Sequence, residues 1–402
     1  MAMIGFFLSN IRWLAAGALL AFSSSYGQTF FIAIFAGEIR RDFGLSHGDW
    51  GLIYGIGTGV SALIMVWAGG LTDRFRVRTL SAITLILLAL SCIAMAVNPF
   101  AGTLVFLILA LRVTGQGMLS HIPAVAMTRW FVASRGRALA IAALGFAVAQ
   151  AFLPMLFVMI KDAVGWRVSW AIAAGFAFLA IPLLVWLLQK ERTPQSHAEE
   201  KGATGMGARH WTRAEAIRHP LFWAFCPSIF GLSAWGTALF FHQVHLAEVK
   251  GWTHADLTLL FPVFTVASVV AMLCAGAAID RFGTRLLVPT YLIPAALGFM
   301  LLASATSLWV GGAAFVIIGA TQGMSAAVPG AFWAEHYGTQ FVGSIKALAT
   351  AVMVAGSAAG PWITGAFIDT GLSFNAQFPL FSVYFVGAGL LAWLGLRSAR
   401  PA

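Results

Sequence analysis

Long apolar runs separated by short polar segments make up most of this chain. A helix that crosses a bilayer needs about 20 mostly apolar residues. Twelve runs approach or exceed that length, and they cover residues 13–36, 50–68, 79–97, 102–127, 138–160, 168–189, 219–245, 256–277, 286–305, 308–331, 343–367 and 378–396. The pattern therefore predicts an all-α membrane protein with twelve transmembrane helices.

One long polar stretch separates the first six runs from the last six. It predicts a six-helix bundle over 1–189, a cytoplasmic linker over 190–218 and a second six-helix bundle over 219–402. Within the linker, Thr212 with Glu215 three residues later has the pattern of a capping box. A short helix is expected there, ending before Pro220 because proline cannot continue it.

The two halves also repeat short segments at a nearly constant offset. Residues 69–75 (GGLTDRF) recur as 276–282 (GAAIDRF), and 44–49 (GLSHGD) recur as 251–256 (GWTHAD), both 207 residues on. The Gln-Gly-Met at 116–118 recurs at 322–324. Since both copies start on the same side of the membrane, they predict pseudo-symmetric parallel repeats with a substrate site between them.

The second repeated segment predicts two helix starts. Ser46 and Thr253 each precede an Asp by three residues, which is a capping arrangement. His47 and His254 follow directly and are expected to be exposed loop residues.

Composition excludes most other classes. Of 402 residues, 60% are hydrophobic and 9% are charged, against about 25% charged in soluble domains. No cleavable signal peptide is expected before the first run. The three cysteines lie far apart in apolar runs and are interpreted as lone thiols, so no metal site, cofactor or disulfide is predicted: Cys92, Cys226 and Cys274.

The net charge of +10 is explained by topology. With both termini in the cytoplasm, most of the 24 basic residues fall on the inner side, as the positive-inside rule requires. We therefore expect a multi-pass, monomeric protein of the inner (plasma) membrane, whose partners are the lipid bilayer and a small molecule and not nucleic acid. The basic residues assigned to the outer side are Arg40, Arg41, Lys161, Arg167 and Lys250.

The first repeated segment predicts a gate. Asp73 and Asp280 sit in tight inner loops, each followed by an arginine, Arg74 and Arg281. A carboxylate there can meet a helix N-terminus and basic side chains when the inner face closes. The expected partners are Arg135 and Arg137 in one half and the region of Lys346 in the other; a solvated loop charge is the alternative.

These residues resemble the major facilitator superfamily. Its loop signature is similar to 69–78 (GGLTDRFRVR), with Arg76 in place of a glycine, and the second copy keeps Gly283. Its helix-4 arginine is similar to Arg112 in 112–117 (RVTGQG), and its Gly-Pro pattern to 356–361 (GSAAGP). The resemblance implies a transporter that works by alternating access.

Three further segments look like the monocarboxylate-porter and oxalate/formate-antiporter branch. They are 25–31 (SYGQTFF), 135–140 (RGRALA) and 215–223 (EAIRHPLFW). That resemblance implies small organic anions as substrates. Mammalian-type monocarboxylate porters carry an arginine in their eighth helix, and the eighth run here has none. The oxalate-type branch uses a lysine deep in its eleventh helix, whereas Lys346 lies at the start of the eleventh run.

Arg112 is the one charge expected at mid-membrane. It lies about ten residues into the fourth run, so roughly 15 Å deep, whereas the 14 acidic residues can all be placed at helix ends or in loops. A central arginine costs about 2.5–3.5 kcal/mol. The matching residue of the second half is Ile318. A transported anion could supply the missing charge; arginine bonded to carbonyls or water is the alternative.

Other polar residues share the spans with Arg112. Tyr54, Thr58 and Ser61 follow one helical face, and each such residue could also simply hold helices together. His242 and His245 are the candidates for proton coupling, because histidine titrates near pH 6.5. The predicted substrate-binding set is Arg112, Tyr26, Gln28, Gln116, Trp235, His242 and Gln322.

The sequence thus predicts a secondary transporter and no enzyme. Its substrate would be a small monocarboxylate or dicarboxylate, moved by proton symport, by anion antiport or without a proton. The alternative is an exporter of hydrophobic or aromatic compounds, which 33 Phe and 15 Trp would favour. An enzyme would need a catalytic cluster within the spans, and the two histidines lack an acid there.

Overall fold

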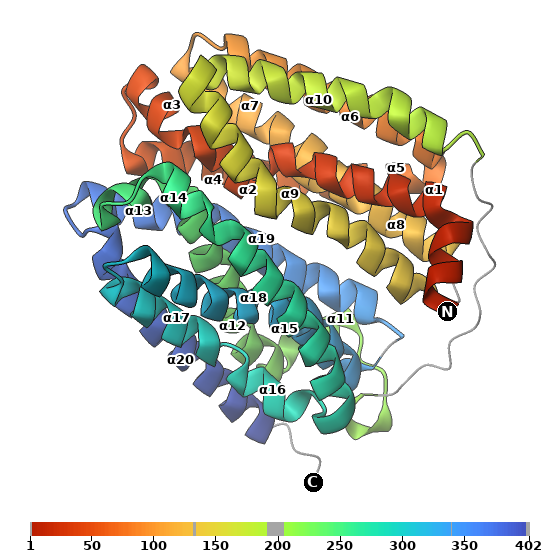
Figure 1. Ribbon diagram of the computed structural model, residues 1–402. Helices are drawn as coiled ribbons and strands as arrows, with labels where there is room; N and C mark the ends of the chain where they lie inside the picture. The colour runs from red at the N-terminus through yellow and green to blue at the C-terminus, as the bar shows by residue number, and fades with distance from the viewer. Residues whose placement is uncertain (1, 132–133, 191–204, 339, 399–402) are drawn as a thin grey trace. The chain divides into compact units, whose positions relative to one another are not determined.

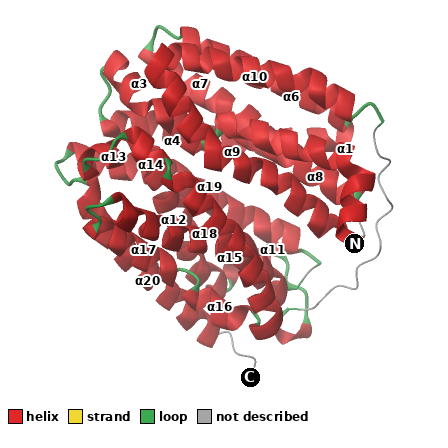
Figure 2. Ribbon diagram, viewed as in Figure 1, coloured by secondary structure: helices red, strands yellow, loops and turns green. Residues whose placement is uncertain are grey.

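Helices account for all regular structure in the parts of the computed structural model that are described, residues 2–131, 134–190, 205–338 and 340–398 (Figure 2). Within these ranges eleven helices are long and apolar enough to cross a membrane. A bent pair, Ser9–Gly27 with Thr29–Phe43, makes the twelfth when counted as one span. The prediction of an all-α protein with twelve spans is confirmed.

Contacts group the chain into two compact units. Unit 1 comprises Met1–Leu45 and Ile53–Glu199, and unit 2 comprises Ser46–Leu52 and Glu200–Ala402. The first turns of one helix, α4, therefore belong to unit 2, although the rest of that helix belongs to unit 1. Residues 191–204 of the expected linker lie outside the described residues.

Unit 1 contains six spans, the first and fourth of them irregular. In it α1 packs along α9, and α10 along α6 (Figure 1). Its elements are α1 (Ala2–Ser23), η1 (Ser24–Gly27), α2 (Thr29–Ile32), η2 (Ala33–Phe35), α3 (Ala36–Phe43), α4 (His47–Ala68), α5 (Leu71–Arg74), α6 (Val77–Val97), η3 (Ala101–Thr103), α7 (Leu104–Leu111), η4 (Arg112–Leu119), α8 (Ser120–Trp130), α9 (Arg135–Val164) and α10 (Trp166–Leu187).

Unit 2 contains the remaining spans and a short helix before them. Its tightest helix pairs are α15 with α18 and α12 with α19, and α17 lies beside α20 (Figure 1). Its elements are η6 (Met206–Ala208), α11 (Arg213–Arg218), α12 (Pro220–Phe241), α13 (Gln243–Lys250), α14 (His254–Thr258), α15 (Leu260–Phe282), α16 (Thr284–Thr290), α17 (Ile293–Ser304), α18 (Leu308–Tyr337), α19 (Val342–Asp369) and α20 (Phe374–Ser398).

The capping motifs occur where the sequence puts them. Thr212 and Glu215 form a reciprocal capping box at α11. Thr253 and Asp256 form another at α14. At the matching position of the first half, the N–H of Asp49 donates to the hydroxyl of Ser46 at 3.0 Å. The repeat in sequence therefore corresponds to a repeat in local structure.

The first span differs from the continuous run expected over 13–36. At Gln28 the backbone is extended (φ −87°, ψ 154°), and the span bends there by 48°. Short 3-10 turns flank the break. Apolar composition alone did not show it, because the few polar residues near this point, residues 23–26, Gln28 and Thr29, leave the run as a whole apolar.

Candidate functional site

Arg112 is positioned by an irregular crossing of two helices. The regular helix α7 ends at Leu111, and residues 112–119 wind as a π-helix, a form often found at functional sites. This segment packs on η1, and a side chain on Gly115 would meet the Cα of Gly27 at 2.6 Å. The two backbones therefore cross with no room for side chains, as small residues allow within membranes.

The break in the first span supplies the partners of one edge of Arg112. Its Nη1 donates to the carbonyl of Gly27 at 3.3 Å and to the hydroxyl of Thr29 at 3.4 Å. Its guanidinium carbon lies 5.2 Å from the ring centre of Tyr54, within the range of a cation–π interaction. Thr29 and Tyr54 are themselves joined by a short hydrogen bond between their hydroxyls.

The other edge of Arg112 has no hydrogen-bond partner among the described residues. The side chain is 1% exposed, and its Nε and Nη2 are buried without a hydrogen bond to any described residue. These two N–H groups are parallel and match the two oxygens of a carboxylate. Because a buried donor without a partner carries a desolvation cost, this edge has the chemistry of a site for an oxyanion.

No acidic side chain compensates Arg112 within the described part of the chain. None of the ion pairs found there includes it. Among the buried polar residues of the same part, it is the single Lys, Arg, Asp or Glu. The sequence prediction of a buried and uncompensated arginine therefore agrees with the geometry, although its role as a binding residue stays a prediction.

The other predicted substrate residues of unit 1 lie at the same crossing. Tyr26 is buried in η1, with its ring edge-on to Phe31 at 5.1 Å and near Phe157. Gln28 is half-buried at the break, and Gln116 is half-buried on the π-helix. Thr29 was missed by sequence reasoning. The signal was present, since Thr29 directly follows the one glutamine in the first apolar run.

The predicted substrate residues of unit 2 are more scattered. Trp235 on α12 stacks on Phe381 at 4.6 Å, and its buried Nε1 has no hydrogen bond to a described residue. Gln322 on α18 is exposed. His242 follows α12 and is 4% exposed.

The two proton-coupling candidates lie in different surroundings. The Nε2 of His242 lies 2.8 Å from the hydroxyl of Thr364 and 3.1 Å from the carbonyl of Pro361. His245 is half-buried on α13, with its Nδ1 3.4 Å from the carboxylate of Glu248.

The prediction that His47 and His254 are exposed loop residues is wrong. His254 is the first residue of α14 and is half-buried. His47 is the first residue of α4 and is half-buried. Its ring centre lies 4.4 Å from that of His245 and 5.9 Å from that of His242. The spacing of Ser46 and Asp49 shows where a helix begins. It does not show which residues distant in sequence pack on the first turn of that helix.

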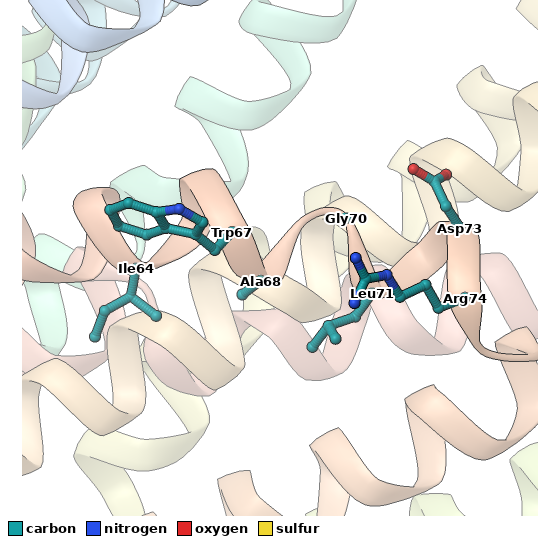
Figure 3. Close-up of a pocket in the computed structure, with 7 residues that line it drawn as sticks. All are labelled: Ile64, Trp67, Ala68, Gly70, Leu71, Asp73 and Arg74. Carbon is teal, nitrogen blue, oxygen red and sulfur yellow. The ribbon is translucent and has the colours of Figure 1, made fainter.

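Residues of the first gating motif and of the end of α4 line an open hollow of about 610 Å³ at the junction of α4 and α5 (Figure 3). Trp67 lines one end, and Asp73 and Arg74 line the other (Figure 3). Asp73 pairs with the guanidinium of Arg129, whose Nη1 also donates to the carbonyl of Thr72 at 2.9 Å.

This pairing differs from the partner expected from sequence. Arg129 is in the last turn of α8, which brings it to the C-terminal end of α5, where a cation is favourable. Arg137 is exposed, and the side chain of Arg135 lies outside the described residues. A role of any of these residues in gating remains a prediction.

The second gating motif makes other contacts. Asp280 and Arg281 are exposed at the end of α15, with Arg281 over the ring of Phe282. The N–H of Thr284 donates instead to Glu335 at 3.0 Å. Glu335 is the repeat counterpart of Arg129, so the halves use opposite charges at one position, and the offset of 206 residues could have revealed this.

Two bacterial proteins named as transporters are similar in sequence to parts of this chain. One is a probable sulfoacetate transporter of Cupriavidus necator, 25% identical over 269 residues, which are 63% of this chain and 61% of that protein. The other is a niacin transporter of Acinetobacter baylyi, 28% identical over 162 residues, which are 40% of this chain and 32% of that protein. The aligned regions thus span less than two thirds of either relative.

Solved structures share the fold over nearly the whole length. A bacterial homologue of the human lysosomal transporter Spinster superposes with a TM-score of 0.72 at 18% identity, covering 98% of each chain. A D-xylose–proton symporter superposes with a TM-score of 0.73 at 16% identity, covering 96% of this chain and 97% of that one. At such identities the likeness concerns the fold alone.

The family assignment rests on a sequence match to nearly the whole chain. Residues 17–248 and 224–402 each match the sequence model of one family. The two overlapping matches together include both repeats, the Arg112 segment and both gating motifs. The chain belongs to the Major Facilitator Superfamily.

Proposed function

We propose that this protein is a secondary transporter that moves a small organic anion across the membrane by alternating access, and that Arg112 binds the oxyanion group. The observation that carries the proposal is the buried Nε and Nη2 edge of Arg112, which has no partner among the described residues. A carboxylate placed there would accept two parallel hydrogen bonds and neutralise the charge.

The cost of burying Arg112 supports the same proposal. A lone arginine at the bilayer centre costs about 2.5–3.5 kcal/mol or more. The chain keeps it although the matching position of the second repeat is the buried Ile318. Because the superfamily fold accepts an apolar residue at the repeat-related site, a ligand is the better explanation of the charge.

The described functions of the two relatives support an anionic substrate. Both are named as transporters, one of sulfoacetate and one of niacin. Each compound carries a carboxylate at neutral pH, and each presents at least one group that fits the open edge of Arg112. Monocarboxylates, dicarboxylates and sulfonates therefore form the substrate class to test first.

The remaining parts of the proposal concern topology and coupling. Large apolar side chains such as Leu179 and Val383 are 68% exposed, as side chains facing lipid would be. We infer two six-helix halves, 1–189 and 219–402, in the inner membrane, with both termini in the cytoplasm and a monomer as the working form. Proton symport would use His242 and His245, whereas anion antiport would need neither.

Transport by purified protein in liposomes tests the proposal. The probes are radiolabelled sulfoacetate, nicotinate and lactate, with a lipophilic aromatic cation for the exporter alternative. Arg112→Lys keeps the charge but loses the fork, so we expect affinity for the anion to fall about tenfold to hundredfold. Arg112→Ala should abolish binding.

Arg167→Lys is the matched control. Arg167 donates to the carbonyls of Ala96 and Asn98 at the end of α6, so it is an arginine with a structural role. Its exchange for lysine should leave anion affinity unchanged. If Arg112→Ala folds and moves an anion with wild-type affinity, the proposal is wrong, and transport of the aromatic cation would favour the exporter.

A further inference from the structure

Three histidines lie together in unit 2 although they come from two distant parts of the chain. His242 and His245 flank the start of α13, and His47 begins α4. The ring centre of His47 lies 4.4 Å from that of His245 and 5.9 Å from that of His242. Imidazole can take a proton at one nitrogen and release it from the other, which makes it the natural residue of a proton shuttle.

Burial changes in steps along this group. Glu248, beside His245, is exposed; His245 and His47 are half-buried; His242 is 4% exposed. The ring centres of His47 and its two neighbours are 4.4 and 5.9 Å apart, close enough for one water to bridge the rings, and a bridging water is nearly as good as a direct hydrogen bond. The series therefore leads from solvent to a buried acceptor.

The buried end offers two oxygen atoms to one nitrogen of His242. The hydroxyl of Thr364 lies 2.8 Å from the carbonyl of Gly360 and 3.1 Å from that of Pro361, so its proton points to the backbone. Its oxygen can then accept from the Nε2 of His242 at 2.8 Å, beside the carbonyl of Pro361 at 3.1 Å. With a proton on Nε2, a second proton must enter at Nδ1, and two acceptors would stabilise the resulting cation.

His47 is held in place by contacts between its own segment, Ser46–Leu52, and the other residues of unit 2. The N–H groups of His47 and Gly48 donate to the carboxylate of Asp369 at 3.1 and 2.7 Å, which places an anion at the N-terminus of α4. A side chain on Gly365 would meet the carbonyl of His47 at 2.4 Å, so the backbones touch. Trp50, 1% exposed, stacks on Phe241.

Only this short part of the first half of the sequence belongs to unit 2, since Ile53 and the residues after it group with unit 1. The position of His47 beside the other histidines thus depends on how α4 begins. We propose that His245, His47 and His242 form a relay that brings a proton from solvent to His242, and that it is complete only while Ser46–Leu52 packs in unit 2.

The proton balance is simple. His245 takes a proton from hydronium or a buffer acid in the solvent and passes a proton to His47. His47 passes on a proton from its other nitrogen, and His242 receives it at Nδ1 and becomes a cation. The first two rings return to neutral. This step rests on the proposed anion transport, in which one proton entering with one monoanion makes the transfer electroneutral.

Other ionisable groups on the packed elements set the local charge. Asp369 and Glu248 are the carboxylates next to the cluster and favour its protonation. Asp49 is bonded back to Ser46, and Lys250 donates to three carbonyls at the end of α17. His254, the repeat counterpart of His47, is bonded to Gln243.

The test compares His47→Gln with His254→Gln, a matched change at the first residue of α14. In liposomes containing a pH dye, an inward gradient of sulfoacetate or nicotinate should carry protons with the wild-type protein. We expect His47→Gln to lower this proton flux by about a hundredfold, while exchange of labelled for unlabelled anion stays within about twofold of wild type. His254→Gln should change neither.

Equal losses of proton flux and exchange in His47→Gln would show a structural role and overturn the relay, and so would unchanged proton flux. Wild-type anion transport without protons would also overturn it, but would leave the proposed function intact. If the protein transports neither sulfoacetate nor nicotinate, the relay can still be tested independently of the proposed function, by NMR of isotope-labelled histidine in nanodiscs. There, exchange of the His242 ring protons with water should slow in His47→Gln alone, and an unchanged rate refutes the relay.

Discussion

The two edges of the Arg112 guanidinium have different surroundings. Nη1 is fastened by Gly27 and Thr29, whereas Nε and Nη2 are buried without a partner among the described residues. The Tyr54 ring lies against the same group. The hydrogen bonds at Nη1 thus fix the orientation of the guanidinium, and with it the direction in which Nε and Nη2 point. Residues that position Arg112 are therefore expected to affect anion binding, as its charge is.

Thr29 is such a positioning residue. Thr29→Val keeps the shape of the side chain but removes its hydrogen bonds to Arg112 and Tyr54. Since hydrogen bonds to charged groups contribute about 1.5–3 kcal/mol, we expect anion affinity to fall about tenfold or more, with turnover at saturation nearly unchanged. Concentration dependence of uptake measures both.

Thr114→Val is the control for Thr29→Val. Thr114 lies on the same π-helix as Arg112, but its hydroxyl donates to the carbonyl of Ala110 within the span and, among the described residues, to no other group. The substitution should leave affinity unchanged. Equal effects of the two substitutions would mean that the loss is one of general packing and not of Arg112 orientation.

At the scale of elements, two glycines permit the crossing of η1 with the π-helix. A side chain on Gly27 would lie 2.1 Å from the carbonyl oxygen of Leu111. Gly27→Ala should therefore push the break in the first span away from Arg112, at a cost of about 1–3 kcal/mol for overpacking.

Thermal unfolding of the purified protein in detergent measures that cost. Gly175→Ala is the control, because Gly175 lies on the span α10 and a side chain there would meet nothing within 4 Å. Gly27→Ala should lower Tm and Gly175→Ala should not. A wild-type Tm for Gly27→Ala would show that the crossing adapts without strain.

The start of α12 depends on a titratable cap. The Nδ1 of His219 accepts from the N–H of Leu221 at 3.2 Å, and Pro220 begins the helix. Desolvation, followed by the charge of Arg209, lowers the pKa of His219. A lowered folded-state pKa means that the cap is fully present above the ordinary pKa of about 6.5 and is lost as the pH falls through the folded-state pKa.

We therefore expect the free energy of unfolding to fall by about 1 kcal/mol between pH 7 and pH 5, which is the usual contribution of a helix cap. His219→Asn keeps a capping oxygen that does not titrate, and so it should remove this part of the pH dependence of Tm. Identical pH dependence in wild type and His219→Asn would show that His219 does not control this end of α12.

At the scale of the whole molecule, the predicted gate depends on the ion pair between Asp73 of α5 and Arg129 of α8. Asp73 and Arg129 are 64% and 39% exposed, and exposed pairs contribute about 0–1 kcal/mol. Asp73→Asn should therefore hardly change Tm. If the pair acts as a gate, turnover should fall several-fold while substrate affinity stays near wild type.

Uptake at saturating anion measures this difference. Asp280→Asn tests the second copy, where Asp280 is exposed and Glu335 accepts from the N–H of Thr284 instead. Exchanging the charges of the first pair, with Asp73→Arg and Arg129→Asp together, should restore part of the turnover. Turnover unaffected in Asp73→Asn would reduce the motif to a solvated loop charge.

The sequence alone determined the membrane class, the twelve spans, the capped helix starts and the buried Arg112, because each is encoded by local pattern: run length, spacing of three residues, or one charge in an apolar segment. Repeat offsets also matched the local structure at both capped starts. These features depend on residues near one another in the chain.

Tertiary structure decided everything that depends on distant segments. The break at Gln28 places Thr29 against Arg112, α8 brings Arg129 and not Arg137 to Asp73, and packing of Ser46–Leu52 in unit 2 places His47 beside His242. No periodicity encodes such approaches, since they follow from where helices bend and how closely glycines let backbones cross.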